Sequence, residues 1–212
     1  MKKIMIMLVS VLVVFEVSAQ EFNVSGDVAY YSKNLSTFTG LMFSEEPAMV
    51  AHMNAGINYK DFNFSASYSG QLGIQHLTEG DRFHMLDLSA GYMVSEKVGL
   101  CAGYELAYTD SEQDELGHGV FAMCTYAGNK VSSNLIFFAD PKIQNTYYIG
   151  SVNVEMMKNV SLYVLGGYTN TKSTPWYGLV GVKYSMDSFF VGTYCVLDKE
   201  NTGPVVSVGM KF

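Results

Sequence analysis

The sequence has few charged residues and few cysteines for its size. Of its 212 residues, 16% are charged and three are cysteine. Disordered and coiled-coil chains carry about a quarter or more charged residues, so the composition excludes both. The net charge of -7 and the pI near 5.0 argue against a nucleic-acid-binding protein, which normally presents a basic face to phosphates. An odd number of cysteines also excludes complete disulfide pairing.

The first nineteen residues are typical of a secretory signal peptide. Lys2 and Lys3 precede an apolar stretch over residues 4–15, and small residues lead up to Ala19. As a helix the stretch would span only ~18 Å, short of the ~30 Å core of a bilayer, although an N-terminal membrane anchor is the alternative. We expect residues 1–19 to be removed near Ala19 and residues 20–212 to form one domain.

Beyond residue 20, apolar residues alternate with small or polar ones. Between residues 49 and 59, for example, Met49, Met53 and Ile57 alternate with His52 and Asn54. A period of two predicts β-strands, because successive side chains point to opposite faces. Twelve such segments follow one another, although the phase near 119–127 and 189–197 is ambiguous. Tight connections (60–61, 95–97, 128–130, 158–159, 187–188) alternate with longer ones (33–48, 77–82, 110–118, 140–145, 170–175, 198–203).

Two architectures produce such a pattern, a soluble sandwich and a membrane barrel. Sandwich strands are shorter, usually about 5–6 residues, whereas tilted membrane strands need ~9–11 residues. The polar face consists mostly of Ser, Asn, Gln and Gly, and aromatic residues recur near strand ends, as interfacial girdles require. The sequence therefore predicts an all-β protein, a single antiparallel transmembrane β-barrel of about 12 strands in the bacterial outer membrane, with both termini periplasmic.

The two ends of the expected barrel resemble known outer-membrane proteins. The C-terminal segment 206–212 alternates and ends in Phe212, and it is similar to the terminal strand that the outer-membrane assembly machinery reads. The segments 25–32, 38–40 and 44–48, which read SGDVAYYS, FTG and SEEPA, resemble the opening of small porins of the TorF type. This resemblance implies a twelve-stranded outer-membrane barrel that acts as a channel.

Most residues expected to face the lumen are short, and this predicts a narrow water-filled pore. They are Ser25, Ala29, Asn54, Gly56, Ser65, Ser67, Ser69, Gly73, Ser89, Gly91, Gly99, Gly103, Ser132, Asn134, Ser161, Gly167, Gly181, Ser185, Ser207 and Gly209. Inward tyrosines together with Phe138 and Leu179 leave open the alternative that the lumen is closed. The runner-up interpretation is thus a non-conducting surface barrel that serves as an adhesin, an envelope element or an accessory subunit of a larger complex.

Charged residues on the inward face are the candidates for selectivity: Asp87, Glu105, Asp27, Glu155, Lys183 and His52. Pairing around the tight turn at 95–97 puts Asp87 opposite Glu105. Two adjacent carboxylates either share a proton or recruit a cation, so an acidic constriction would favour cations. The alternative is that a lysine from across the lumen neutralises them in a structural network.

No pattern in the sequence indicates catalysis or a bound cofactor. There is no G-x-S-x-G or comparable nucleophile setting, and the acidic segment 110–119 departs from the EF-hand pattern where Gly and the bidentate Glu are needed. We therefore expect a protein that is not an enzyme and has no cofactor or metal. Its expected partners are outer-membrane lipid, the assembly machinery and small solutes, and its oligomeric state stays open.

Overall fold

The computed structural model describes residues 21–32, 34–35, 42–44, 47–72, 82–109, 115–140, 145–170, 176–198 and 203–212. The regular elements of these residues are strands. They are Glu21–Tyr31 (β1), Asn34–Leu35 (β2), Met42–Ser44 (β3), Ala48–Tyr59 (β4), Phe62–Leu72 (β5), Phe83–Ser95 (β6), Val98–Thr109 (β7), Glu115–Ala127 (β8), Val131–Asp140 (β9), Asn145–Met157 (β10), Val160–Thr169 (β11), Trp176–Met186 (β12), Phe189–Asp198 (β13) and Gly203–Lys211 (β14).

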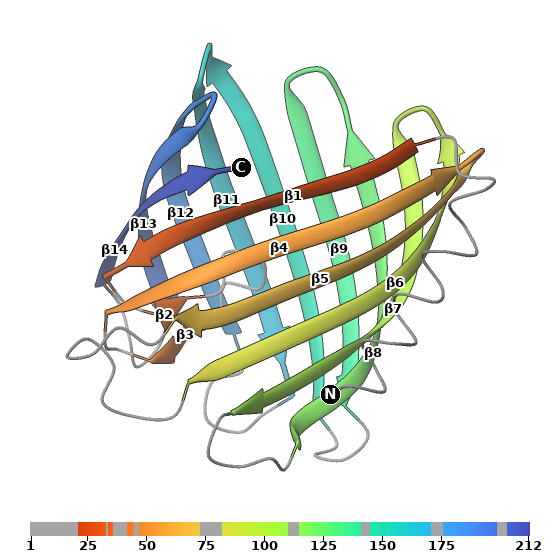
Figure 1. The fold of residues 1–212 in the computed structure, drawn as a ribbon. Coiled ribbons are helices and arrows are strands. Elements are labelled where there is room, and N and C mark those ends of the chain that lie inside the picture. Colours follow the sequence, from red (N-terminus) through yellow and green to blue (C-terminus); the bar gives the residue numbers. More distant parts are fainter. Residues whose placement is uncertain are drawn as a thin grey trace.

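Twelve of these strands close into one antiparallel barrel, in which β1 pairs with both β4 and β14 (Figure 1). Every other barrel strand pairs with its neighbours in the sequence. The predicted all-β barrel of about twelve strands is therefore confirmed. The segment 33–48, predicted to be one long loop, contains the two short strands β2 and β3, which pair only with each other.

Within the part of the chain that the structure describes, no helix is both long and apolar enough to cross a membrane.

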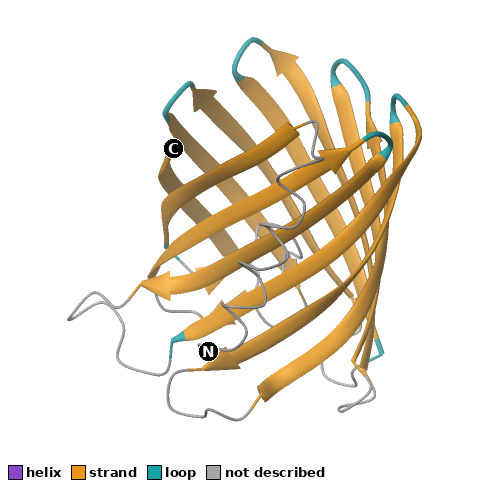
Figure 2. Ribbon diagram, turned by 45° about the vertical axis from the view of Figure 1, so that its right-hand side comes forward, coloured by secondary structure: helices purple, strands orange, loops and turns teal. Residues whose placement is uncertain are grey.

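Tight turns join alternate strand pairs at one end of the barrel (Figure 2). They lie between β4 and β5, β6 and β7, β8 and β9, β10 and β11, and β12 and β13, where the sequence predicts them. Lys60 and Asn159 have φ angles of 53° and 69°, the left-handed conformation that two-residue hairpins use. Because such short turns leave little slack, they fix the register of the strands that they join.

The outer face of the barrel is apolar along its strands. On β7, Leu100 and Tyr104 are 50% and 42% exposed, whereas Cys101 and Gly103 between them point inward. The two strands of ambiguous phase follow the same rule. Val120 on β8 is exposed, so Phe121 faces the lumen, whereas on β13 Tyr194 is the inward residue and is buried. Exposed apolar side chains are stable only against an apolar medium, so this face fits a lipid environment.

The C-terminal residue takes part in closing the barrel. Asp27–Tyr31 of β1 pairs with Ser207–Lys211 of β14. Beyond these pairs, the Phe212 N–H donates to the Gly26 carbonyl oxygen at 3.0 Å, and the Gly26 N–H donates to the Phe212 carbonyl oxygen at 3.2 Å. The side chain of Phe212 is exposed. The seam between the first and last barrel strands is thus completed by the terminal aromatic residue.

Most of the buried apolar residues face the barrel interior and form one cluster, to which the buried Ile57 and Met85 do not belong. The cluster members come from β1, β4 and β9–β14, and they are Ala29, Tyr31, Ala48, Val50, Ile136, Ile149, Leu165, Tyr177, Leu179, Phe190, Tyr194, Val196 and Val205. We call this set the apolar wall. The inward positions of β5 to β7 contribute no member to it, so the two halves of the lumen differ in chemistry.

Several inward glycines lie beneath aromatic rings from the next strand. The ring of Tyr194 covers Gly181, and the ring of Phe121 covers Gly103, each so close that a side chain added at the glycine would force its surroundings to shift. The prediction that short inward residues leave the lumen open is therefore wrong at these positions, because neighbouring rings occupy the space. Such pairing of a ring with a cross-strand glycine stabilises the sheet instead.

Candidate functional site

Small polar side chains follow the inner face of β4–β7, opposite much of the apolar wall. They hydrogen-bond to one another across the strands. Asn63 Nδ2 donates to Asn58 Oδ1 at 2.6 Å, and the hydroxyls of Ser65 and Ser89 lie 2.6 Å apart. We call the polar inward residues of β4–β7 the polar wall. Its side chains are mostly short, and several of them hydrogen-bond across the strands.

Asp87 and Glu105 lie directly opposite each other on β6 and β7, in the register that the turn at 95–97 predicts. Ser67 on β5 donates a hydrogen bond from its hydroxyl to Asp87 Oδ2 at 3.0 Å. Asp87 Oδ1 is inaccessible to solvent and has no hydrogen-bond partner among the described residues. The carboxylate pair therefore presents an unsatisfied acceptor within the polar wall.

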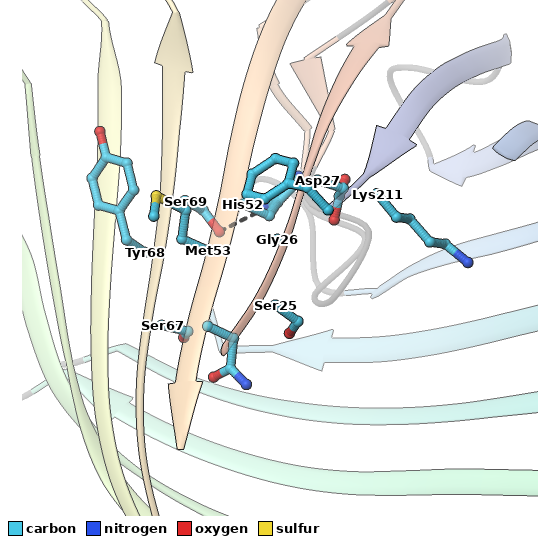
Figure 3. Close-up of a pocket in the computed structure, with 11 residues that line it drawn as sticks. Ser25, Gly26, Asp27, His52, Met53, Ser67, Tyr68, Ser69 and Lys211 are labelled. Carbon is cyan, nitrogen blue, oxygen red and sulfur yellow. Dashed lines mark hydrogen bonds between the residues drawn. The ribbon is translucent and has the colours of Figure 1, made fainter. Parts of the chain in front are cut away.

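Asp27 and His52 form a second polar group, nearer the seam of the barrel (Figure 3). Asp27 pairs across the strands with His52 on β4 and with Lys211 on β14. His52 Nδ1 lies 2.9 Å from the Ser69 hydroxyl, and its Nε2 lies 3.4 Å from the Tyr31 hydroxyl. A cavity of about 310 Å³ adjoins this group, lined by Ser25, Gly26, Asp27, His52, Met53, Asn54, Ser67, Tyr68, Ser69, Lys211 and Phe212.

Lys183 lies across the barrel from Asp87, and Glu155 lies near a tight turn. Strands β12 and β6 are six positions apart in the twelve-stranded order, so Lys183 and Asp87 are on opposite walls. The Lys183 ammonium group lies 4.0 Å from the centre of the Phe190 ring, a cation–π contact. Glu155 is exposed and pairs with Ser161 close to a tight turn. In the described residues, Lys183 thus stacks on an aromatic ring instead of forming an ion pair with the carboxylates across the lumen.

Sequence reasoning missed Asp140, which lies at the end of β9 and is 4% exposed. On β8, Val120 pairs with Ala139, the residue before Asp140, and Gly119 pairs with Glu105 on β7. Gly119 therefore lies between Glu105 and Asp140 across the sheet, and it has no side chain to separate them. Their electrostatic interaction extends the carboxylate pair into a group of three acidic residues.

The comparisons with known proteins identify the fold. No protein-family model matches the chain, and no curated protein matches it significantly in sequence. Among solved structures it is similar to the KdgM porin, with a TM-score of 0.61 and 10% identity over 89% of this chain and 98% of that one. A second structure, "KdgM porin in complex with disordered oligogalacturonate", has a TM-score of 0.64 and 11% identity, with the same coverage.

A third similar structure is the COG4313 outer membrane channel from Pseudomonas putida F1. Its TM-score is 0.55 at 11% identity, and the match covers 92% of this chain and 96% of that one. At these identities the likeness concerns the fold alone, and that fold is the porin-like outer-membrane barrel. The more specific resemblance to TorF-type porins stays a prediction, because no finding addresses it.

Proposed function

We propose that the protein is a narrow outer-membrane channel for small cationic or neutral solutes. The observation that carries the proposal is the division of the lumen into a polar wall on β4–β7 and an apolar wall opposite. In this arrangement the solute path runs off-centre along the polar wall, past Asp87 and Glu105. The apolar wall fills part of the cross-section, which restricts passage to small molecules.

The charge of the lumen favours cations over anions. Among inward positions whose side chains are described, carboxylates outnumber lysines: Asp27, Asp87, Glu105, Asp140 and Glu155 against Lys183 and Lys211. One structure of the similar KdgM porin is a complex with disordered oligogalacturonate, a chain of acidic sugars. An acidic path repels such a ligand, so we expect this channel to serve a different class of solute.

The proposal also covers the cellular location of the barrel and its assembly into the membrane. The apolar outer face places the barrel in a bilayer, and residues 1–19 supply an export signal, with cleavage near Ala19. The tight-turn end then faces the periplasm, as short turns do in bacterial outer-membrane barrels. The terminal strand that ends in Phe212 is the segment that the assembly machinery would engage. Membership of the TorF-type porins is the family assignment that we propose from residues 25–48.

Planar-bilayer recording of the refolded protein tests the channel. We expect discrete conductance steps and a reversal potential in a KCl gradient that shows preference for K⁺. In the variant with Asp87→Asn and Glu105→Gln, the preference should fall while conductance steps persist. Added oligogalacturonate should leave the wild-type current unchanged.

Two outcomes would contradict the proposal. Absence of conductance steps from correctly folded protein would favour the non-conducting barrel, with a role in adhesion or as an accessory subunit. Steps with unchanged selectivity in the double variant would show that the carboxylates are a structural network only. Heat-dependent mobility on gels distinguishes folded barrels from unfolded chains, and it serves as the folding control for the wild type and the double variant.

A further inference from the structure

Buried polar side chains line the lumen at the ends of β9, β11 and β12 that lie away from the tight turns. Asp140, Thr169 and Tyr177 are 4%, 3% and 5% exposed. On the strand between β9 and β11, Tyr147 pairs with Thr169 on one side and with Phe138 on the other. Aromatic and acidic residues thus occur together on four consecutive strands, outside the polar wall.

The hydroxyl of Tyr177 is directed into this group. Tyr177 pairs with Gly167 of β11, and its ring and hydroxyl lie directly above that glycine. The side chain therefore reaches from β12 across β11 towards β10, the strand that carries Tyr147. The hydroxyl is inaccessible to solvent and has no hydrogen-bond partner among the described residues. A buried hydroxyl without a partner is costly, and a bound polar group would satisfy it.

The other side of the group is acidic and aromatic. Tyr147 pairs with Phe138, which lies two residues before Asp140 on the same face of β9. The ring of Phe138 covers Gly119, the glycine between Glu105 and Asp140. The rings of Phe138 and Tyr147 have centroids 5.5 Å apart at an angle of 57°. Two carboxylates, two aromatic rings and a phenolic oxygen therefore face the lumen from β7, β9, β10 and β12.

We propose that this group, Glu105, Asp140, Phe138, Tyr147 and Tyr177, is a binding site for organic ammonium ions. The ammonium N–H groups would donate to the carboxylates and to the Tyr177 oxygen, while the carbon skeleton packs on the rings, whose faces attract cations. No group of three His, Cys, Asp or Glu side chains in the described residues has the arrangement to hold a metal ion, so an organic cation is the better match. The inference rests on the proposed function, because it names the solute class of the channel.

Isothermal titration calorimetry of the full refolded protein in detergent tests the site, with benzylammonium chloride as the probe. Benzyl alcohol, which has the same ring without the charge, is the matched ligand. We expect heats of binding for the ammonium ion and none for the alcohol. Asp140→Asn should weaken ammonium binding about tenfold through loss of a charge-assisted hydrogen bond, and Tyr177→Phe about fivefold through loss of a neutral one.

Tyr168→Phe is the matched control variant, because it removes the same hydroxyl from the outer face, where Tyr168 is 53% exposed. Its affinity should equal that of the wild type. Equal binding of benzyl alcohol, or unchanged affinity in Tyr177→Phe, would overturn the site. If Asp140→Asn fails to fold, the site is tested by comparing the benzylammonium affinities of Tyr177→Phe and Tyr168→Phe.

Calorimetry also separates this inference from the proposed function, since it needs no current. Binding without conductance steps in planar bilayers would refute the channel and keep the ammonium site. Conductance with cation preference but no ammonium binding would refute the site and keep the channel.

Discussion

Neutralising Asp87 and Glu105 should change how fast charged reagents modify Cys101. Cys101 lies on β7 and faces the lumen, because it shares a face with Glu105 and pairs with Gly91 and Met123. The other two cysteines point to the outer face. With both replaced by alanine, Cys101 reports the electrostatic potential of the lumen. The ratio of its reaction rates with a cationic and an anionic methanethiosulfonate is the measured quantity.

Strand geometry gives the size of the effect. Cys101 and Glu105 are four residues apart, about 13 Å at ~3.3 Å per residue, and Asp87 lies at a similar distance. In water each carboxylate changes the energy of a unit charge at Cys101 by about 0.3 kcal/mol. At 10 mM salt, a Debye length of about 30 Å leaves about 0.4 kcal/mol from the pair. Since a cation gains this energy and an anion loses it, the rate ratio should be about fourfold higher than in the neutral variant.

The assay compares trimethylammonium-ethyl and sulfonatoethyl methanethiosulfonate on the refolded barrel. Because both reagents attack the same thiolate, their ratio is independent of its ionised fraction. The variant with Asp87→Asn and Glu105→Gln should lower the ratio about fourfold, or about twofold if the pair shares one proton. The control variant, Asp61→Asn with Asp187→Asn, removes two charges from exposed turns and should leave the ratio unchanged. An unchanged ratio in the lumenal variant, or a change that persists at 1 M salt, would refute the reasoning.

Two further predictions concern the stability of the barrel. Gly181→Ala should lower the free energy of unfolding in lipid vesicles by about 1–3 kcal/mol, because the new methyl group meets the Tyr194 ring. Gly166 is on the outer face, and nothing lies within 4 Å of a carbon added there, so the free energy of unfolding of Gly166→Ala should stay within about 0.5 kcal/mol of the wild type. Equal losses of stability in Gly181→Ala and Gly166→Ala would contradict the argument that the ring covers the glycine. Deletion of Phe212 removes both hydrogen bonds to Gly26 and should cost about 1–3 kcal/mol, whereas Phe212→Ala keeps them. Folding yields measured by gel mobility should therefore fall more for the deletion, and equal yields would disprove a role for these bonds.

The carboxylate pair could be predicted from the sequence because two strong signals agree there. The alternation runs without a break from Leu86 to Tyr92 on β6 and from Val98 to Leu106 on β7. The tight turn at 96–97 lies eight or nine residues away and leaves little freedom for the register. Strand alternation and turn length therefore place two residues eighteen positions apart opposite each other without any structural information.

Asp140 could not be predicted because its position depends on strands with weaker signals. Apolar side chains occur on both faces of β8, where Phe121 and Met123 point inward and Val120 points outward. Without the phase of β8, the register from β7 to β9 is undefined. Asp140 also stands where the sequence predicts a long connection, at 140–145, although it is the last residue of β9. Its proximity to Glu105 therefore emerges only when the barrel is closed.

The inward glycines were misinterpreted for a related reason. Alternation assigns Gly103 and Gly181 to the lumen but says nothing about the length of the cross-strand neighbour on the same face. Phe121 and Tyr194 occupy these neighbouring positions, so each ring fills the space that its glycine leaves. Lumen width depends on such pairs and not on the size of single residues, and pairs are known only once the register is known.

The division of the lumen into two walls separates stability from selectivity. A barrel of twelve strands is wider than eight strands, which side chains can fill, so packing across its whole interior is not available. The apolar wall on β1, β4 and β9–β14 provides buried contacts in one part of the lumen, and the polar wall on β4–β7 is left to interact with solutes. Substitutions such as Gly181→Ala should therefore lower stability without altering ion preference. Substitutions at Asp87 should alter ion preference with little loss of stability. Asp87 Oδ1 is a buried acceptor without a hydrogen-bond partner among the described residues, so removing its charge also removes an unfavourable buried group.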